Sequence, residues 1–137
     1  MTDLQLAKDN LKDHSVSFAK GKTAFVLDGK GIAPLLSIVG EKRDLSGFAV
    51  CDKIVGKAAA MLFVKMGVKI VFGIVMSKSA KAFLEDNGIE CKFDTLADAI
   101  INHAGTGSCP MEEVVANLFD VDEAHAALVK RLEKMRK

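Results

Sequence analysis

A cysteine, a histidine and a glutamate fall within one glycine-rich stretch of the chain, NHAGTGSCPMEE (102–113). Cys109 precedes Pro110, a residue type that is favoured at the first position of a helix. Glu112 lies three residues after Cys109, in the first turn, where acidic residues are also favoured. A thiol at a helix N-terminus lies in a positive potential that lowers its pKa and makes it nucleophilic. His103 can then act as its base or orient a ligand. The stretch is therefore a candidate site for a Cys109-based enzyme.

The same stretch also has a purely structural interpretation. Ser108 or Cys109 can cap the helix, and the Cys-Pro pair then needs no chemistry. Glu112, one turn on, opposes formation of a thiolate. We expect Cys109 to be a site residue that contacts a ligand, and the sequence leaves open whether it is a nucleophile.

A second set of candidates follows two predicted parallel strands. The strand GFAVC (47–51) ends at Asp52, and the strand VKIVFGIVM (68–76) ends at Ser77 and Lys78. In an open α/β sheet, ligands gather outside the carboxyl ends of such strands. Each junction also presents free backbone N–H groups and the positive end of a helix dipole, which suit an anionic group.

The helix predicted from Asp52 carries a glycine and a lysine with candidate roles. Gly56 would lie inside this helix, where glycine costs about 1 kcal/mol relative to alanine, so a packing or binding role is expected. Lys57 is expected to be the charge partner of a ligand, whereas Lys53 is expected to extend into solvent. Asp52 is either the polar anchor or base of the site, or only an N-cap.

The sequence therefore predicts a site for a nucleotide-like or otherwise anionic small molecule. Its candidate ligand-binding residues are Gly56, Lys57, Ser77, Lys78, His103 and Glu112, and its candidate catalytic residues are Cys109 and Asp52.

Several familiar chemistries have no motif in this chain. It contains no C-x-x-C and no His/Cys pair at a usual zinc spacing, so no metal site is predicted. It also lacks the G-x-S-x-G elbow and the Rossmann glycine fingerprint. VGKAAA is not a P-loop, because no Ser or Thr follows its lysine. The identity of any cofactor stays unknown, and zinc is not expected.

Composition favours one small domain of 137 residues, 50% of them hydrophobic. With 19 basic and 18 acidic residues there is no basic footprint, so nucleic acid is an unlikely partner. No apolar run approaches the roughly 20 residues of a membrane span. Three widely spaced cysteines favour reduced thiols in a cytoplasm, with Cys51 and Cys91 in strands. The mean hydropathy of +0.22 favours a homodimer, and a non-catalytic dimeric interaction module is the alternative function.

Hydrophobic periodicity and glycine breaks predict the elements that position these residues. The predicted helices are 2–13, 32–41, 52–67, 78–88, 97–102, 110–119 and 121–137, and the predicted strands are a hairpin over 15–28 followed by 47–51, 68–76 and 89–95. Alternating strands and helices predict an α/β fold with three layers, α/β/α, and a mixed sheet of about five strands. Strand 68–76 should be flanked by parallel partners, with the hairpin as an antiparallel edge.

Two runs in this sequence match a known family: D-x-x-x-G-K-A-A-A at 52–60 and C-P-M-E at 109–112. With the segments around them, CDKIVGKAAAMLFVKMGVKIVFGIVMSKSAKAFLEDNGI and INHAGTGSCPMEE, they resemble a family of small prokaryotic proteins of unknown function. This family is grouped by structure with the cytidine deaminase-like fold. The resemblance covers most of the chain and implies that fold, with strand order 2-1-3-4-5.

The resemblance does not extend to deaminase chemistry. Zinc deaminases carry His/Cys-x-Glu at the start of one helix and P-C-x-x-C at the start of the next. The corresponding helix starts here read DKIVGKAA and SKSAKAF, and neither holds the zinc ligands or the glutamate. We therefore expect neither stoichiometric zinc nor deamination of cytidine or adenosine.

Overall fold

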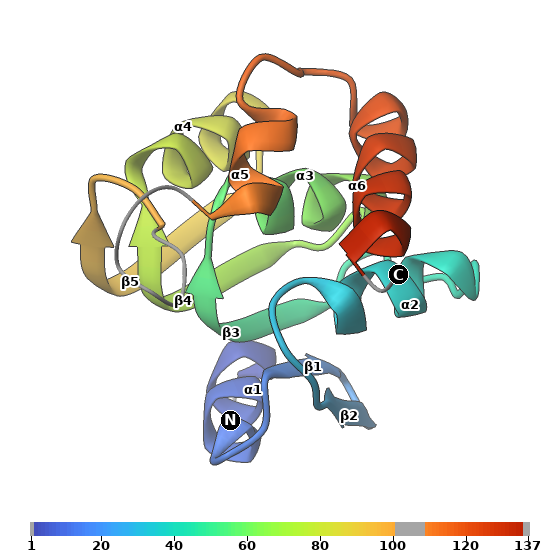
Figure 1. Cartoon of the computed structure of the whole chain (residues 1–137). Coiled ribbons are helices and arrows are strands. Elements are labelled where there is room, and N and C mark those ends of the chain that lie inside the picture. The colour runs from blue at the N-terminus through green and yellow to red at the C-terminus, as the bar shows by residue number, and fades with distance from the viewer. Residues whose placement is uncertain (1, 101–108, 136–137) are drawn as a thin grey trace.

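The computed structural model describes residues 2–100 and 109–135, and a five-stranded sheet lies at its centre (Figure 1). The strands are β1 (Val16–Lys20), β2 (Thr23–Leu27), β3 (Ala49–Val55), β4 (Ile70–Ser77) and β5 (Glu90–Ala97). The helices are α1 (Asp3–Leu11), α2 (Ala33–Gly40), α3 (Lys57–Met66), α4 (Lys78–Asp86), α5 (Pro110–Val115) and α6 (Val121–Met135).

The sheet is open and mixed, with the strand order β2-β1-β3-β4-β5. β1 pairs with β2 and with β3 in antiparallel register, whereas β4 is parallel to both of its neighbours, β3 and β5. Gly21 adopts a φ of 59° in the turn of the β1–β2 hairpin, a conformation that glycine tolerates without strain. The predicted hairpin, the parallel partners of strand 68–76 and the strand order are confirmed.

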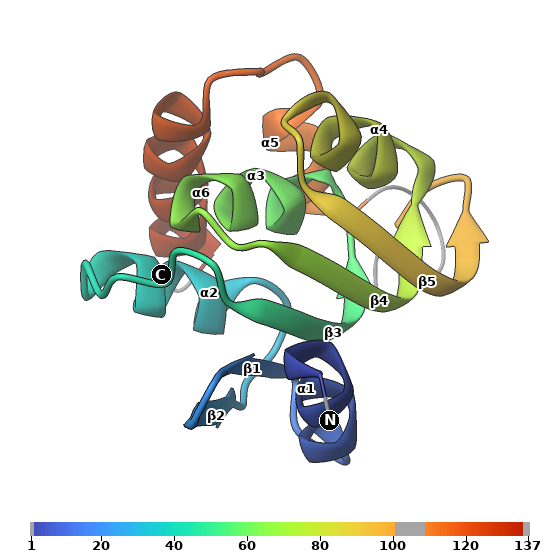
Figure 2. The same cartoon turned by 180° about the vertical axis from the view of Figure 1, so that it is seen from behind.

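The two faces of the sheet are covered unequally. Figures 1 and 2 show α2 to α6 on one face and α1 on the other. The larger core lies under the five helices, and a smaller one under α1 joins Ala7 and Leu11 to Ala19, Cys51 and Phe72. The α/β fold and its mixed sheet are thus as predicted, but α1 alone forms the third layer and lies mainly against β1 and β3.

The prediction for residues 52–67 is wrong in its first turn. Asp52 lies inside β3, paired with Val16 on β1 and Gly73 on β4, and is not the N-cap of a helix. The strand continues to Val55 because β4 extends the ladder to Ile54 and Val55, and β-branched residues favour such a position. α3 begins at Lys57, so Gly56 is its N-cap and not an interior helical residue.

The helical segment predicted at 97–102 is also not found in its described part. Ala97 ends β5, paired with Ser77, and residues 98–100 are not helical. The ladder with β4 therefore outweighs the helical preference of this alanine-containing segment. Residues 101 and 102 lie outside the described part of the chain.

The start of α4 and the end of α3 each have a local cause in the sequence. The Ser77 hydroxyl accepts a hydrogen bond from the Ala80 backbone N–H at 3.1 Å and so caps α4. Gly67 ends α3 with a φ of 76°. No helix in the described ranges is both long and apolar enough to cross a membrane.

Candidate ligand-binding site

The starts of α3 and α4 lie at the same edge of the sheet, where the parallel strands β3 and β4 end (Figure 1). The start of α5 is held against that of α3, because the Glu112 carboxylate accepts hydrogen bonds from the backbone N–H groups of Lys57, at 2.7 Å, and Ala58, at 2.9 Å. A Cβ atom at Gly56 would overlap this carboxyl group. The place expected to attract an external anion is therefore filled by a side chain of the same chain, and Gly56 is the residue that leaves room for it.

Cys109 is the N-cap of α5, and Pro110 is its first residue, as the structural interpretation predicts. Its backbone N–H donates to the Ile100 carbonyl oxygen at 3.1 Å. The thiol makes no capping hydrogen bond, and the half-buried side chain packs against the larger core. The catalytic role of Cys109 stays a prediction, and its suggested base, His103, lies outside the described residues.

Ser77 and Lys78 form the second junction. Ser77 is buried, and its hydroxyl lies 3.2 Å from that of Ser79 as well as capping α4. The ammonium of Lys78 pairs with Asp98 at 2.7 Å, which raises the pKa of Lys78 and lowers that of Asp98. Both side chains are exposed, so the pair contributes little to stability.

The Lys57 side chain turns from the helix start toward the connection between α5 and α6. Its ammonium donates to the Ala116 carbonyl oxygen at 3.2 Å and lies 4.5 Å from the centroid of the Phe119 ring. The residue is only 8% exposed. No salt bridge to Lys57 is found in the described part of the chain, and Glu112 contacts its backbone and not its ammonium.

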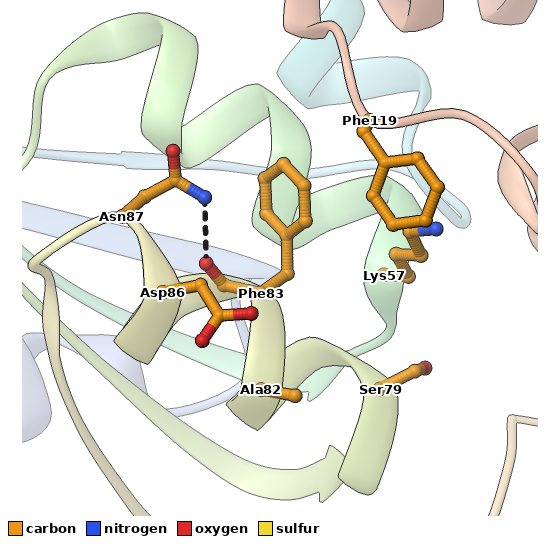
Figure 3. Close-up of a pocket in the computed structure, with 7 residues that line it drawn as sticks. All are labelled: Lys57, Ser79, Ala82, Phe83, Asp86, Asn87 and Phe119. Carbon is orange, nitrogen blue, oxygen red and sulfur yellow. Dashed lines mark hydrogen bonds between the residues drawn. The ribbon is translucent and has the colours of Figure 1, made fainter.

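Lys57 and Phe119 lie at one end of an open groove of about 400 Å³. Its other wall is one face of α4 and the residue after it, and Figure 3 shows the Phe83 ring between Asn87 and Phe119. The seven lining residues are Lys57, Ser79, Ala82, Phe83, Asp86, Asn87 and Phe119. The groove thus combines a cation, two aromatic rings and a carboxylate on a partly apolar surface.

Sequence reasoning found Lys57 but missed the rest of this groove. Ser79, Phe83 and Asp86 follow the three- and four-residue spacing of one helical face, which is a signal in the sequence. Phe119 carried no such signal, because its position depends on where the short helix α5 ends. The groove therefore required the tertiary structure.

Asp52 is a separate buried group on β3. One of its oxygens accepts a hydrogen bond from the Ile54 backbone N–H at 3.3 Å, and burial raises the pKa of the carboxyl group to about 7. No basic side chain pairs with it in the described ranges. A carboxylic acid with a pKa near neutrality can take up and release a proton at physiological pH.

The other thiols lie in strands, as predicted. Cys51 is buried beneath α1, and burial raises its pKa to about 11. Cys91, on β5, is half-buried, and burial raises its pKa as well. Within residues 2–100 and 109–135, no three His, Cys, Asp or Glu side chains gather where they could hold a metal ion.

Comparison with known proteins identifies the family of this chain. The model of the family "TM1506: Domain of unknown function (DUF1893)" matches residues 6–132. The crystal structure of a DUF1893 family protein (TM1506) from Thermotoga maritima matches with a TM-score of 0.84 at 24% sequence identity, over 96% of this chain and 91% of that one. No curated protein matches the chain. The protein therefore belongs to the DUF1893 family, whose function is unknown.

Proposed function

We propose that this protein binds a small anionic molecule in the groove between α3, α4 and Phe119, with the Lys57 ammonium as the charge partner. The observation that carries the proposal is that Lys57 is only 8% exposed and that no salt bridge reaches it in the described ranges. An ammonium has three N–H donors, and the hydrogen bond to Ala116 uses one of them. Burying a charge without a counter-ion is unfavourable. A bound anion would supply the missing counter-ion.

This location differs from the helix start at which the sequence places the ligand. The free N–H groups of α3 already hold the Glu112 carboxylate, so an external anion would have to displace it. Glu112 and Gly56 instead act as positioning residues, since they fix the backbone of Lys57. Ser77 supports the groove indirectly, because it caps the helix that supplies the second wall.

Calorimetric titration with inorganic phosphate and with AMP tests the proposal, and Lys57→Met is the informative variant. Lys65→Met is the matched control, because Lys65 lies on the same helix but pairs with Asp122. We expect the wild type and the control to bind at least one of the two anions equally, and Lys57→Met to bind it at least about tenfold more weakly, or about 1.4 kcal/mol. Equal binding by Lys57→Met, or no binding of either anion by the wild type, would contradict the proposal.

A second candidate function rests on Asp52, a buried carboxyl group inside β3 whose pKa of about 7 suits a general acid or base. Lys78 and Cys109 lie at the starts of α4 and α5, and His103 and Cys109 keep their predicted roles as base and nucleophile in this candidate. The reaction of such a site stays unassigned.

We expect the family to share the cytidine deaminase-like fold without its zinc chemistry, and the chain to act in the cytoplasm. We also expect a homodimer. A non-catalytic dimeric interaction module is the rival function, and it predicts that no anion binds at Lys57.

A further inference from the structure

We infer that the anion held by Lys57 carries a flat aromatic ring, which stacks on the side chain of Phe119. This inference rests on the proposed function and names the class of its ligand. Phe119 is 75% exposed, the largest exposed fraction among the exposed large hydrophobic side chains of the described residues. Exposed apolar surface beside a groove is typical of a binding surface.

The Phe119 ring is held in place before any ligand arrives. The Lys57 ammonium lies 4.5 Å from its centroid, which is within the range of a cation–π interaction. Lys57 is itself fixed by the Ala116 carbonyl oxygen, so one lysine orients both the charge and the ring of the site. A ring oriented in this way binds a flat partner with a smaller loss of conformational entropy.

The opposite wall supplies a second aromatic surface. Phe83 lies within α4 and packs in the larger core, and the 7% of it that is exposed lies at the groove, where Figure 3 shows its ring between Asn87 and Phe119. Flat rings favour offset-stacked or edge-to-face contacts with aromatic side chains, worth about 0.5–1.5 kcal/mol beyond the area they bury. An aromatic ligand therefore fits this groove better than a saturated one of the same charge.

The far end of the groove favours a ring that carries N–H groups. The Asn87 amide nitrogen donates to the Phe83 carbonyl oxygen at 2.8 Å, which leaves the amide oxygen of this lining residue as an acceptor. The Asp86 carboxylate beside it is a second acceptor. The arrangement runs from a cation through two rings to two acceptors, which suits an anionic group, a flat ring and ring N–H donors in that order.

The volume of the groove limits the size of the ligand. Small-molecule sites commonly measure about 300–1,000 Å³, and this groove, at about 400 Å³, lies near the lower limit. It suits one ring system with one anionic group and not a dinucleotide.

Titration with phenyl phosphate, methyl phosphate and benzyl alcohol separates the ring from the charge. We expect the wild type to bind phenyl phosphate at least about tenfold more tightly than methyl phosphate, and to bind benzyl alcohol far more weakly than either. Phe119→Ala should reduce the affinity for phenyl phosphate to that for methyl phosphate, whereas Phe119→Tyr should retain the preference. Ile54→Ala is the matched control, because Ile54 is also exposed but lies outside the groove.

The outcomes distinguish this inference from the proposed function. If the wild type binds both phosphates equally and Lys57→Met binds neither, the anion site stands and the aromatic ligand is excluded. If neither phosphate binds the wild type, or Lys57→Met binds them as the wild type does, both claims fail. Thermal unfolding of Phe119→Ala near the wild-type temperature shows that lost binding is not lost folding, as expected for a side chain that is mostly exposed.

Discussion

Asp52 and Lys57 are two buried side chains, one acidic and one basic, that lie five positions apart and differ in how the fold accommodates their charge. Burial raises the pKa of the Asp52 carboxyl group to about 7, so the group stays protonated and uncharged below that pH. Lys57 is buried to a similar degree but shares its charge with a carbonyl oxygen and an aromatic ring. The first residue suits proton exchange, and the second suits anion binding.

The stability of the protein should fall as the pH rises from about 4 to about 7 because of Asp52. In this window the unfolded chain releases the Asp52 proton, near its ordinary pKa of 3.8, while the folded chain retains it. The folded state thus binds more protons than the unfolded state in this window. The free energy of unfolding therefore falls by about 4 kcal/mol, for a shift of this size, between about pH 4 and pH 7.

Urea unfolding of wild type and Asp52→Asn across pH 4–8 measures this effect. Asparagine imitates the protonated acid, so the variant should lack the contribution of Asp52 to the slope and should gain stability relative to wild type above pH 7. Parallel stability curves for the two proteins would show that Asp52 is ionised in the folded state.

Among the three thiols, we expect Cys109 to be alkylated fastest in the folded protein. Cys51 is buried with its pKa raised to about 11, and the pKa of Cys91 is also raised, so both should carry little thiolate at neutral pH. Mass spectrometry of iodoacetamide-treated protein over time measures the order. If Cys109 in the folded protein is alkylated no faster than Cys51, its role is only that of the N-cap of α5.

At the scale of elements, α5 supports α3 through one carboxylate. Glu112 satisfies two backbone donors at the start of α3 that its N-cap, Gly56, cannot satisfy with a side chain. Its charge also faces the positive end of the helix dipole. The six residues of α5 are thereby tied to the helix whose first residue, Lys57, lines the groove.

Glu112→Ala should lower the free energy of unfolding by about 2 kcal/mol, since two charge-assisted hydrogen bonds are lost. Glu113→Ala is the matched control, because Glu113 is its exposed neighbour. Urea unfolding compares the two, and an equal effect would mean that the Glu112 contact adds nothing to stability.

Gly56→Ala should destabilise the wild type, because its Cβ would overlap the Glu112 carboxyl. In the Glu112→Ala background the same change should cost much less, so the two effects should not add. Additive losses in a double-mutant cycle would contradict this account of Gly56.

Sequence patterns predicted the elements better than their boundaries. The hairpin and the strand VKIVFGIVM were evident because alternation and continuous apolar character are local signals. The prediction for the segment DKIVGKAAA was wrong at its start. The alanine run is helical, but Ile54 and Val55 continue a strand because they pair with β4, which the local sequence does not show. Lys57 is a candidate from the sequence and lines the groove, but the contact of Glu112 with its backbone joins residues 55 positions apart and leaves no local trace.

At the scale of the whole molecule, the unequal covering of the sheet leaves apolar side chains in solvent. Ile54 and Ile74 are 55% and 38% exposed, on β3 and β4. Together with the high hydrophobic content of the chain, this exposure favours burial against a second copy.

Light scattering at micromolar concentration should therefore give about twice the chain mass of 14.7 kDa. Ile74→Lys should shift the equilibrium toward monomer, since it places a charge on the exposed apolar surface. A wild type that stays monomeric would exclude the homodimer.

The place at which an anion binds can be located directly in solution. Backbone amide spectra of ¹⁵N-labelled protein, titrated with phenyl phosphate, report this location residue by residue. We predict saturable shifts centred on Lys57, on the face of α4 from Ser79 to Asn87, and on Phe119. Shifts confined to the part of β3 around Asp52, or no saturable shifts at all, would contradict an anion site at Lys57.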